Sequence, residues 1–71
     1  MLEVVRLFLR GKPFQPFRVV MRSGARHDVI DPDRVAIGKS QVFLYSHPSN
    51  RMTWLPEAEI ELVYEPRNPR R

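Results

Sequence analysis

The hydrophobic period of the chain changes at Phe17, and this change constrains the fold more than any other feature. Before it, apolar residues recur at spacings of three and four, as they do on one face of an α-helix. After it, apolar and polar residues alternate in short runs that are separated by turn residues. We therefore predict one N-terminal helix followed by short β-strands joined by tight turns.

The helix is predicted over residues 2–10. Its apolar stripe consists of Leu2, Val5, Phe8 and Leu9. Gly11 and Pro13 end it, because glycine commonly follows a helix and proline cannot continue one. A helix this short is not stable alone in water, so it must dock on the rest of the chain. The linker that follows repeats a Pro-Phe step, which predicts a stiff, extended segment with Phe14 and Phe17 as anchors.

About five antiparallel strands are predicted from the alternation: 17–22, 25–30, 41–46, 51–55 and 60–64. Residues 35–37 form either a further short strand or the continuation of the one before. A single-turn corner at 56–58 separates the last two strands. Short antiparallel strands at close spacing favour a closed or nearly closed barrel, which hides its edges. The expected core consists of Phe8, Phe17, Val19, Met21, Val29, Ile37, Val42, Leu44, Ile60 and Leu62.

The length of 71 residues allows one small domain, which we assign to residues 1–65. Residues 66–71 read PRNPRR, and we expect a disordered basic tail there. The chain has no cysteine, which excludes a disulfide scaffold and a thiolate metal site. No apolar run approaches the length of a membrane span, and no signal-peptide pattern is evident. We therefore expect a cytoplasmic protein that has no contact with a membrane.

Two resemblances follow from these residues. The run PFQPFR at 13–18, the Ser-Gly turn at 23–24 and Asp-Pro-Asp at 31–33 are similar to a group of small uncharacterised bacterial proteins. That group shares a helix, a Pro-Phe-x-Pro-Phe linker and a β-rich remainder, and it has no established activity. The run FRVVMRSG at 17–24 resembles the strand and glycine turn that open the Sm1 motif of Sm-like proteins.

The second resemblance, with the strand–corner–strand ending, implies a small SH3-like or Sm-like barrel with an N-terminal helix. It would also imply RNA binding, because the Sm-like proteins include a bacterial RNA chaperone. The chain departs from the family's binding motif, however. Asp31 stands at a comparable place but no Asn follows it, and the run RMTW at 51–54 replaces the basic motif near the last strands.

The strand 41–46 has apolar residues on both faces. Val42 and Leu44 point one way, and Phe43 and Tyr45 point the other. A strand with one face in water does not need this pattern. Either the N-terminal helix or a partner subunit covers the outer side chains. The candidate interaction surface consists of Phe43, Tyr45 and Trp54.

The net charge of +4 and the pI near 10.4 raise the possibility of a polyanionic partner. Residues 1–26 hold six basic and one acidic residue, whereas 27–65 hold three basic and seven acidic. If the first and last strands pair, Arg18 and Arg22 would face Glu59 and Glu61, and the two halves would neutralise each other. The remaining candidate polyanion contacts are Arg26, Arg34, Arg67, Arg70 and Arg71.

No constellation for catalysis or metal binding stands out. His27 and His47 are isolated, and no Ser-His-Asp set or glycine-rich phosphate loop is evident. We expect no enzyme activity, no metal and no cofactor. The predicted function is a non-catalytic protein-interaction or self-associating module that forms a homo-oligomer or binds a protein partner. The alternative is an Sm-like RNA-binding protein, so nucleic acid is a possible but less favoured partner.

Overall fold

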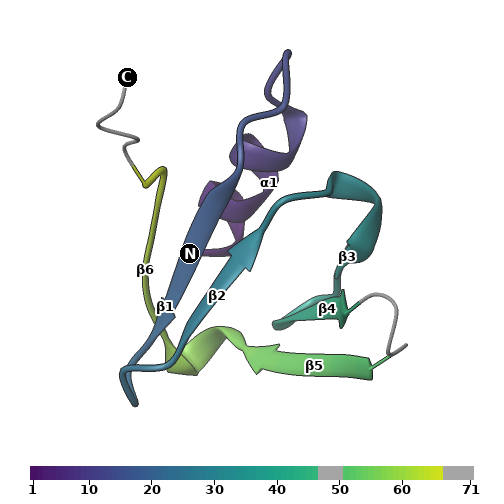
Figure 1. Ribbon diagram of the computed structural model, residues 1–71. Helices are drawn as coiled ribbons and strands as arrows, with labels where there is room; N and C mark the ends of the chain where they lie inside the picture. Colours follow the sequence, from purple (N-terminus) through teal and green to yellow (C-terminus); the bar gives the residue numbers. More distant parts are fainter. Residues whose placement is uncertain (47–50, 67–71) are drawn as a thin grey trace.

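The computed structural model describes residues 1–46 and 51–66 of the chain (Figure 1). Its elements are α1 (Leu2–Arg10), β1 (Phe17–Met21), β2 (Arg26–Val29), η1 (Pro32–Arg34), β3 (Val35–Ile37), β4 (Gln41–Ser46), β5 (Arg51–Pro56), η2 (Glu57–Glu59) and β6 (Ile60–Tyr64). η1 and η2 are single 3₁₀ turns. The predicted mainly β fold with one N-terminal helix is confirmed. Among the described residues, six strands are found rather than five, because residues 35–37 form a strand of their own.

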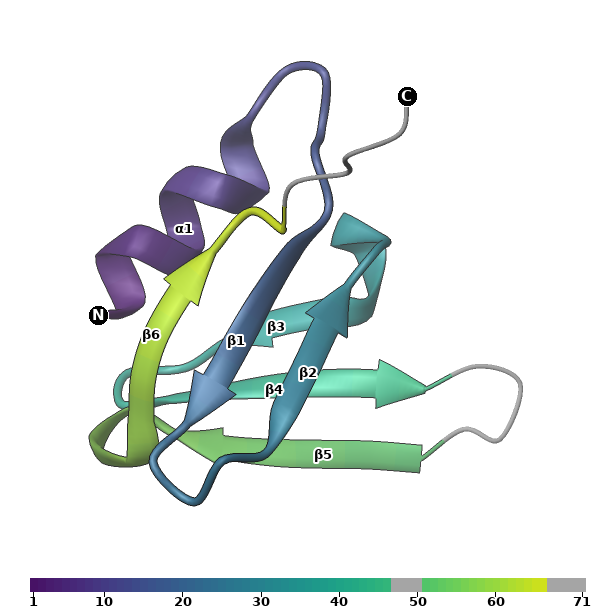
Figure 2. The same cartoon turned by 60° about the vertical axis from the view of Figure 1, so that its left-hand side comes forward.

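The six strands form two antiparallel three-stranded sheets. The first sheet has the order β2–β1–β6, and the second has the order β3–β4–β5. The strands of the second sheet run across those of the first, and η1 and η2 connect the two sheets (Figure 2). The predicted closed barrel is not confirmed, since no ladder joins the two sheets within the described residues.

One hydrophobic core lies between the two sheets and the helix. Its buried residues are Leu2, Val5, Phe17, Val19, Met21, Val29, Val42, Leu55 and Ile60. Three further predicted core residues, Phe8, Ile37 and Leu44, are partly buried against it. Leu2, Val5 and Leu55 are also buried, although the expected core did not include them.

The helix docks through its predicted stripe. Leu2 and Val5 are buried, and the Phe8 ring stacks on Phe17 with ring centroids 5.1 Å apart. Phe14 meets the same Phe17 ring edge-on at 6.2 Å, so the linker supplies an aromatic anchor at each end as expected. α1 lies beside β6 (Figure 2), and its first turn is next to the η2 corner that follows β5.

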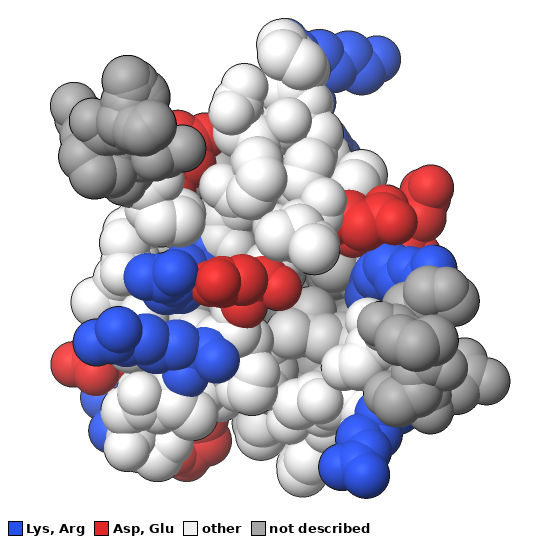
Figure 3. Space-filling model, viewed as in Figure 1, with Lys and Arg blue, Asp and Glu red and all other residues white. Residues whose placement is uncertain are grey.

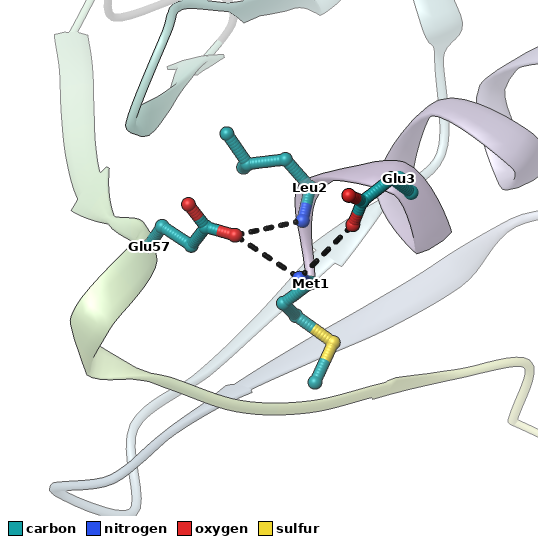
Figure 4. Close-up of polar contacts among 4 residues, drawn as sticks. All are labelled: Met1, Leu2, Glu3 and Glu57. Carbon is teal, nitrogen blue, oxygen red and sulfur yellow. Dashed lines mark hydrogen bonds and ion pairs between the residues drawn. The ribbon is translucent and has the colours of Figure 1, made fainter.

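A glutamate from the β5–β6 corner holds the first turn of α1 (Figure 4). Glu57 Oε2 accepts hydrogen bonds from the Leu2 backbone N–H at 3.3 Å and from the Met1 ammonium at 3.0 Å. The hydrogen bond from the ammonium, followed by the one from Leu2, lowers the pKa of the Glu57 carboxyl below its usual value. A carboxylate at this end also suits the helix dipole. The corner is therefore tied to the first turn of the helix.

The prediction that Leu62 belongs to the core is wrong. β1 and β6 pair as expected, with Val20 opposite Leu62 and Met21 opposite Ile60. Glu61 is consequently an extra residue, a β-bulge that interrupts the alternation of β6. Ile60 remains buried, but Leu62 turns outward and is 40% exposed.

No helix in the described part of the chain is long and apolar enough to cross a membrane.

Candidate functional site

Two rows of side chains cross the outer surface of the second sheet. Their members are Ala36, Phe43 and Trp54 in one row, and Tyr45 and Met52 in the other. Directly opposite residues of an antiparallel pair share a face of the sheet. Val42 and Leu55, which alternate with them, are buried in the core, so the two rows lie on the outer face. We call these five residues the apolar face.

The apolar face is open to solvent. Trp54 is 61% exposed, Met52 53% and Tyr45 46%. A shallow hollow of about 300 Å³ lies on this face, lined by Ala36, Phe43, Tyr45 and Met52. Trp54 does not line the hollow but stands next to it, opposite Phe43. The face thus combines one exposed aromatic ring with an adjacent shallow depression.

The described strands β3, β4 and β5 carry no charged side chain on their outward positions. Beyond the apolar face, these positions hold only Gln41 and Pro56. The outer face of the first sheet is different. It holds Arg18, Val20, Arg26, Asp28, Leu62 and Tyr64. Charged side chains of both signs lie together over β1 and β2 (Figure 3), as expected for a sheet face in water.

α1 does not cover the apolar face. Its buried stripe enters the core between the sheets, where Leu2 and Val5 join the same cluster as Val42. The outer side of β4 was expected to be covered either by the N-terminal helix or by a partner subunit. The helix does not cover it, because it packs into the core instead. Phe43, Tyr45 and Trp54, the residues singled out from the sequence, are brought together on one surface.

Sequence reasoning missed two members of this face. Met52 was detectable, because it precedes Trp54 by two residues and strand alternation places both on one side. Ala36 was not detectable from alternation alone. Its place depends on the pairing of β3 with β4, which puts it opposite Phe43.

The predicted pairing of Arg18 and Arg22 with Glu59 and Glu61 is wrong. The neighbour of Arg18 on β6 is Tyr64, and its ionic partner lies on β2. Arg18 Nε donates to Asp28 Oδ1 at 2.6 Å, and a second guanidinium nitrogen donates to Oδ2 at 3.2 Å. These hydrogen bonds lower the pKa of the Asp28 carboxyl.

Arg22 makes backbone-directed contacts instead of an ion pair. Its Nε donates to the Ala58 carbonyl at 2.9 Å, and its backbone N–H donates to the Glu59 carbonyl at 2.8 Å. Arg22 therefore secures the η2 corner through main-chain oxygens.

The candidate polyanion contacts are not brought together. Arg26 begins β2, whereas Arg34 ends the η1 turn that follows the other end of that strand. Arg34 Nε also lies 3.7 Å from Asp31 Oδ2, as an ion pair within one turn. The predicted basic tail, residues 66–71, lies outside the described residues except for Pro66. The same holds for its three arginines, Arg67, Arg70 and Arg71.

In the part of the chain that the structure describes, the histidine and carboxylate side chains form no metal-binding cluster. His27 lies on β2 opposite Val19, and His47 is outside the described residues. Within residues 1–46 and 51–66, no group of three or more His, Cys, Asp or Glu side chains is placed to hold a metal ion.

A second hollow, of about 460 Å³, opens between the end of β2 and the end of β4. It is lined by Asp28, Val29, Ile30, Asp31, Arg34, Val35, Leu44, Tyr45 and Ser46. Its charged groups already have partners within the chain, since Asp28 pairs with Arg18 and Asp31 with Arg34. Tyr45, a member of the apolar face, also lines this second hollow.

Comparison with protein-family models, curated proteins and solved structures gave no match to this chain.

Proposed function

We propose that the chain is a non-catalytic protein-interaction module that binds another folded protein through the apolar face. The observation that carries the proposal is the contrast between its two sheets. The outer face of the first sheet carries charged residues of both signs, whereas the outward positions of β3, β4 and β5 are uncharged and mostly apolar. Both outer faces are exposed to solvent in a single chain. Exposure to water therefore does not explain why one face carries charges and the other is apolar.

The composition of the apolar face supports this role. Tryptophan, tyrosine, phenylalanine and methionine are enriched in the centres of protein interfaces, and charged residues are depleted there. Removing apolar surface from water is favourable by about 25 cal/mol per Å². Trp54 and Tyr45 are of the types that most often dominate binding energy, and both are exposed.

The proposed fold type remains a small SH3-like or Sm-like barrel. It is supported by the order of helix and strands, by the 3₁₀ corner before the last strand and by the pairing of β1 with β6. RNA binding in the manner of Sm-like proteins has less support, because Arg26 and Arg34 lie at different ends of β2. The resemblance to the small bacterial proteins adds no function to this proposal.

Native mass spectrometry of protein purified gently from its source cells tests the proposal. We expect the wild-type chain in a protein-only particle heavier than the 8.4 kDa of one chain. Trp54→Arg should dissociate that particle, whereas Leu7→Arg should not. Leu7 is a matched control because it is 68% exposed on α1, compared with 61% for Trp54.

Two results would contradict the proposal. One is a wild-type spectrum that contains only the single chain. The other is a particle whose extra mass is nucleic acid and survives Trp54→Arg, which would favour the RNA-binding alternative.

A further inference from the structure

We infer that the partner of the apolar face is a second copy of this chain, arranged so that Trp54 of each copy lies over Ala36 of the other. This inference rests on the proposed function and specifies the binding partner. It is argued from the charge, the side-chain sizes and the relief of the face.

The charge of the face suits a contact with itself. A two-fold symmetric interface brings the same patch of both subunits together, so any charged residue near its axis would meet a like charge. The outward positions of β3, β4 and β5 are uncharged and create no such repulsion. On the first sheet, by contrast, a two-fold axis along the central strand β1 would bring together the two copies of Arg18.

The sizes of the side chains are also self-complementary. The row across the face runs from Ala36 on β3, through Phe43 on β4, to Trp54 on β5. Neighbouring strands lie about 4.8 Å apart, so the small residue and the large one are on opposite sides of Phe43 at similar distances. Consider a two-fold axis that lies in the plane of contact and runs parallel to β4. It places the β5 side of one copy over the β3 side of the other. It therefore places tryptophan over alanine twice, with the two Phe43 rings next to the axis.

The relief of the face matches the same arrangement. Ala36 belongs to the lining of the shallow hollow, whereas Trp54 projects next to it with 61% of its surface exposed. In the symmetric pair, each tryptophan ring enters the other copy's hollow. Tyr45, which lines the same hollow from the central strand β4, then contacts that ring.

Sedimentation equilibrium of the purified recombinant chain tests the inference. We expect a reversible monomer–dimer equilibrium with a Kd between about 1 µM and 1 mM, because the patch is small for a protein interface. Trp54→Ala should raise the Kd at least about tenfold. Leu7→Ala, with similar exposure on α1, should leave it unchanged. A wild-type monomer throughout this range would overturn the inference, as would a dimer insensitive to Trp54→Ala.

A size exchange tests the arrangement itself. Ala36→Trp should also weaken the dimer, because two tryptophan rings would then compete for one space. The double variant Ala36→Trp/Trp54→Ala reverses the large and small positions and should dimerise at least about tenfold more tightly than either single variant. If both single variants weaken the dimer and the double variant does not recover, the placement of Trp54 over Ala36 is wrong. Unchanged circular dichroism of each variant confirms that the outer-face substitutions leave the fold intact.

The two proposals fail in distinguishable ways. A recombinant monomer together with a heavier, Trp54-dependent protein particle from cells overturns the second-copy inference and leaves the proposed function standing. Single chains in both experiments overturn both proposals.

Discussion

Arg18 and Trp54 occupy the same kind of position, the outward side of a strand, but their surroundings differ. Arg18 has an acceptor within its own sheet, since Asp28 lies opposite it on β2 and both carboxylate oxygens receive its hydrogen bonds. Trp54 lies opposite Phe43 and remains 61% exposed. The guanidinium of Arg18 has its hydrogen-bond acceptors inside the chain. The apolar surface of Trp54 stays exposed to solvent.

The Arg18–Asp28 pair should make stability depend on pH. The pKa of Asp28 is lowered mainly by its hydrogen bonds from Arg18. A lowered folded-state pKa stabilises the fold above the pH at which the unfolded carboxyl titrates, and this contribution is lost as the pH falls through the folded-state value. We therefore expect Asp28→Asn to lower the Tm at about pH 7 and the deficit to shrink towards about pH 3.

Thermal denaturation followed by circular dichroism measures this deficit. Glu61→Gln is the control, because Glu61 is exposed at the bulge and no side-chain hydrogen bond or ion pair is found for it within the described residues. A deficit for Asp28→Asn that stays constant across the pH range would show that the loss arises from packing rather than from the charge.

At the scale of elements, the bulge in β6 decides which side chains reach the core. Ile60 is 3% exposed and Leu62 40%, although both would share a face in a regular strand. Ile60→Ala should therefore cost about 2–5 kcal/mol in the free energy of unfolding. Leu62→Ala should cost only about 0.5 kcal/mol, as a surface substitution does.

Chemical denaturation of the two variants provides the comparison. If Ile60→Ala is too unstable to measure, Ile60→Val should still cost about 0.5–1.5 kcal/mol. Equal losses for the alanine variants at Ile60 and Leu62 would mean that β6 alternates regularly and that the bulge is absent in solution.

Elements that depend on local pattern were predictable, and contacts between distant segments were not. The helix at 2–10 and the strand at 41–46 match their predicted bounds. The helix carries a clear period, the strand is rich in residues that favour strands, and turn residues follow each of them. The bulge at Glu61 leaves no such signal, so alternation placed Leu62 in the core. The ionic partner of Arg18 depends on which strand lies on each side of β1, and that information is not local.

The candidate site, like the fold, was predictable where it depends on the pattern within one strand and not where it depends on distant segments. Apolar residues on both sides of one strand indicated that the outer side of β4 needs a cover, and three members of the face were named on that basis. Where α1 docks depends on its own buried stripe and on Glu57 at the η2 corner, which is far away in sequence. The period of the helix indicates which of its faces is buried but not which surface it packs against.

At the scale of the whole molecule, the two sheets share one core and present different outer surfaces. The first sheet's outer face carries Arg18, Arg26 and Asp28, and the second sheet's carries none of these residue types. The overall pI near 10.4 therefore describes the chain as a whole and not the surface on which the proposed function depends. Association through an uncharged face should also vary little with salt, unlike binding to a polyanion.

Trp54 is the only tryptophan in the chain, so its fluorescence reports on the apolar face alone. The emission spectrum should be measured from about 1 µM to about 1 mM protein, the range expected for a small interface. Our account predicts a shift towards shorter wavelength and reduced acrylamide quenching with increasing concentration, as each ring enters the other copy's hollow. Leu7→Ala should show the same shift. An emission maximum and a quenching constant that do not change with concentration would contradict the central claim that this face binds a second copy of the chain.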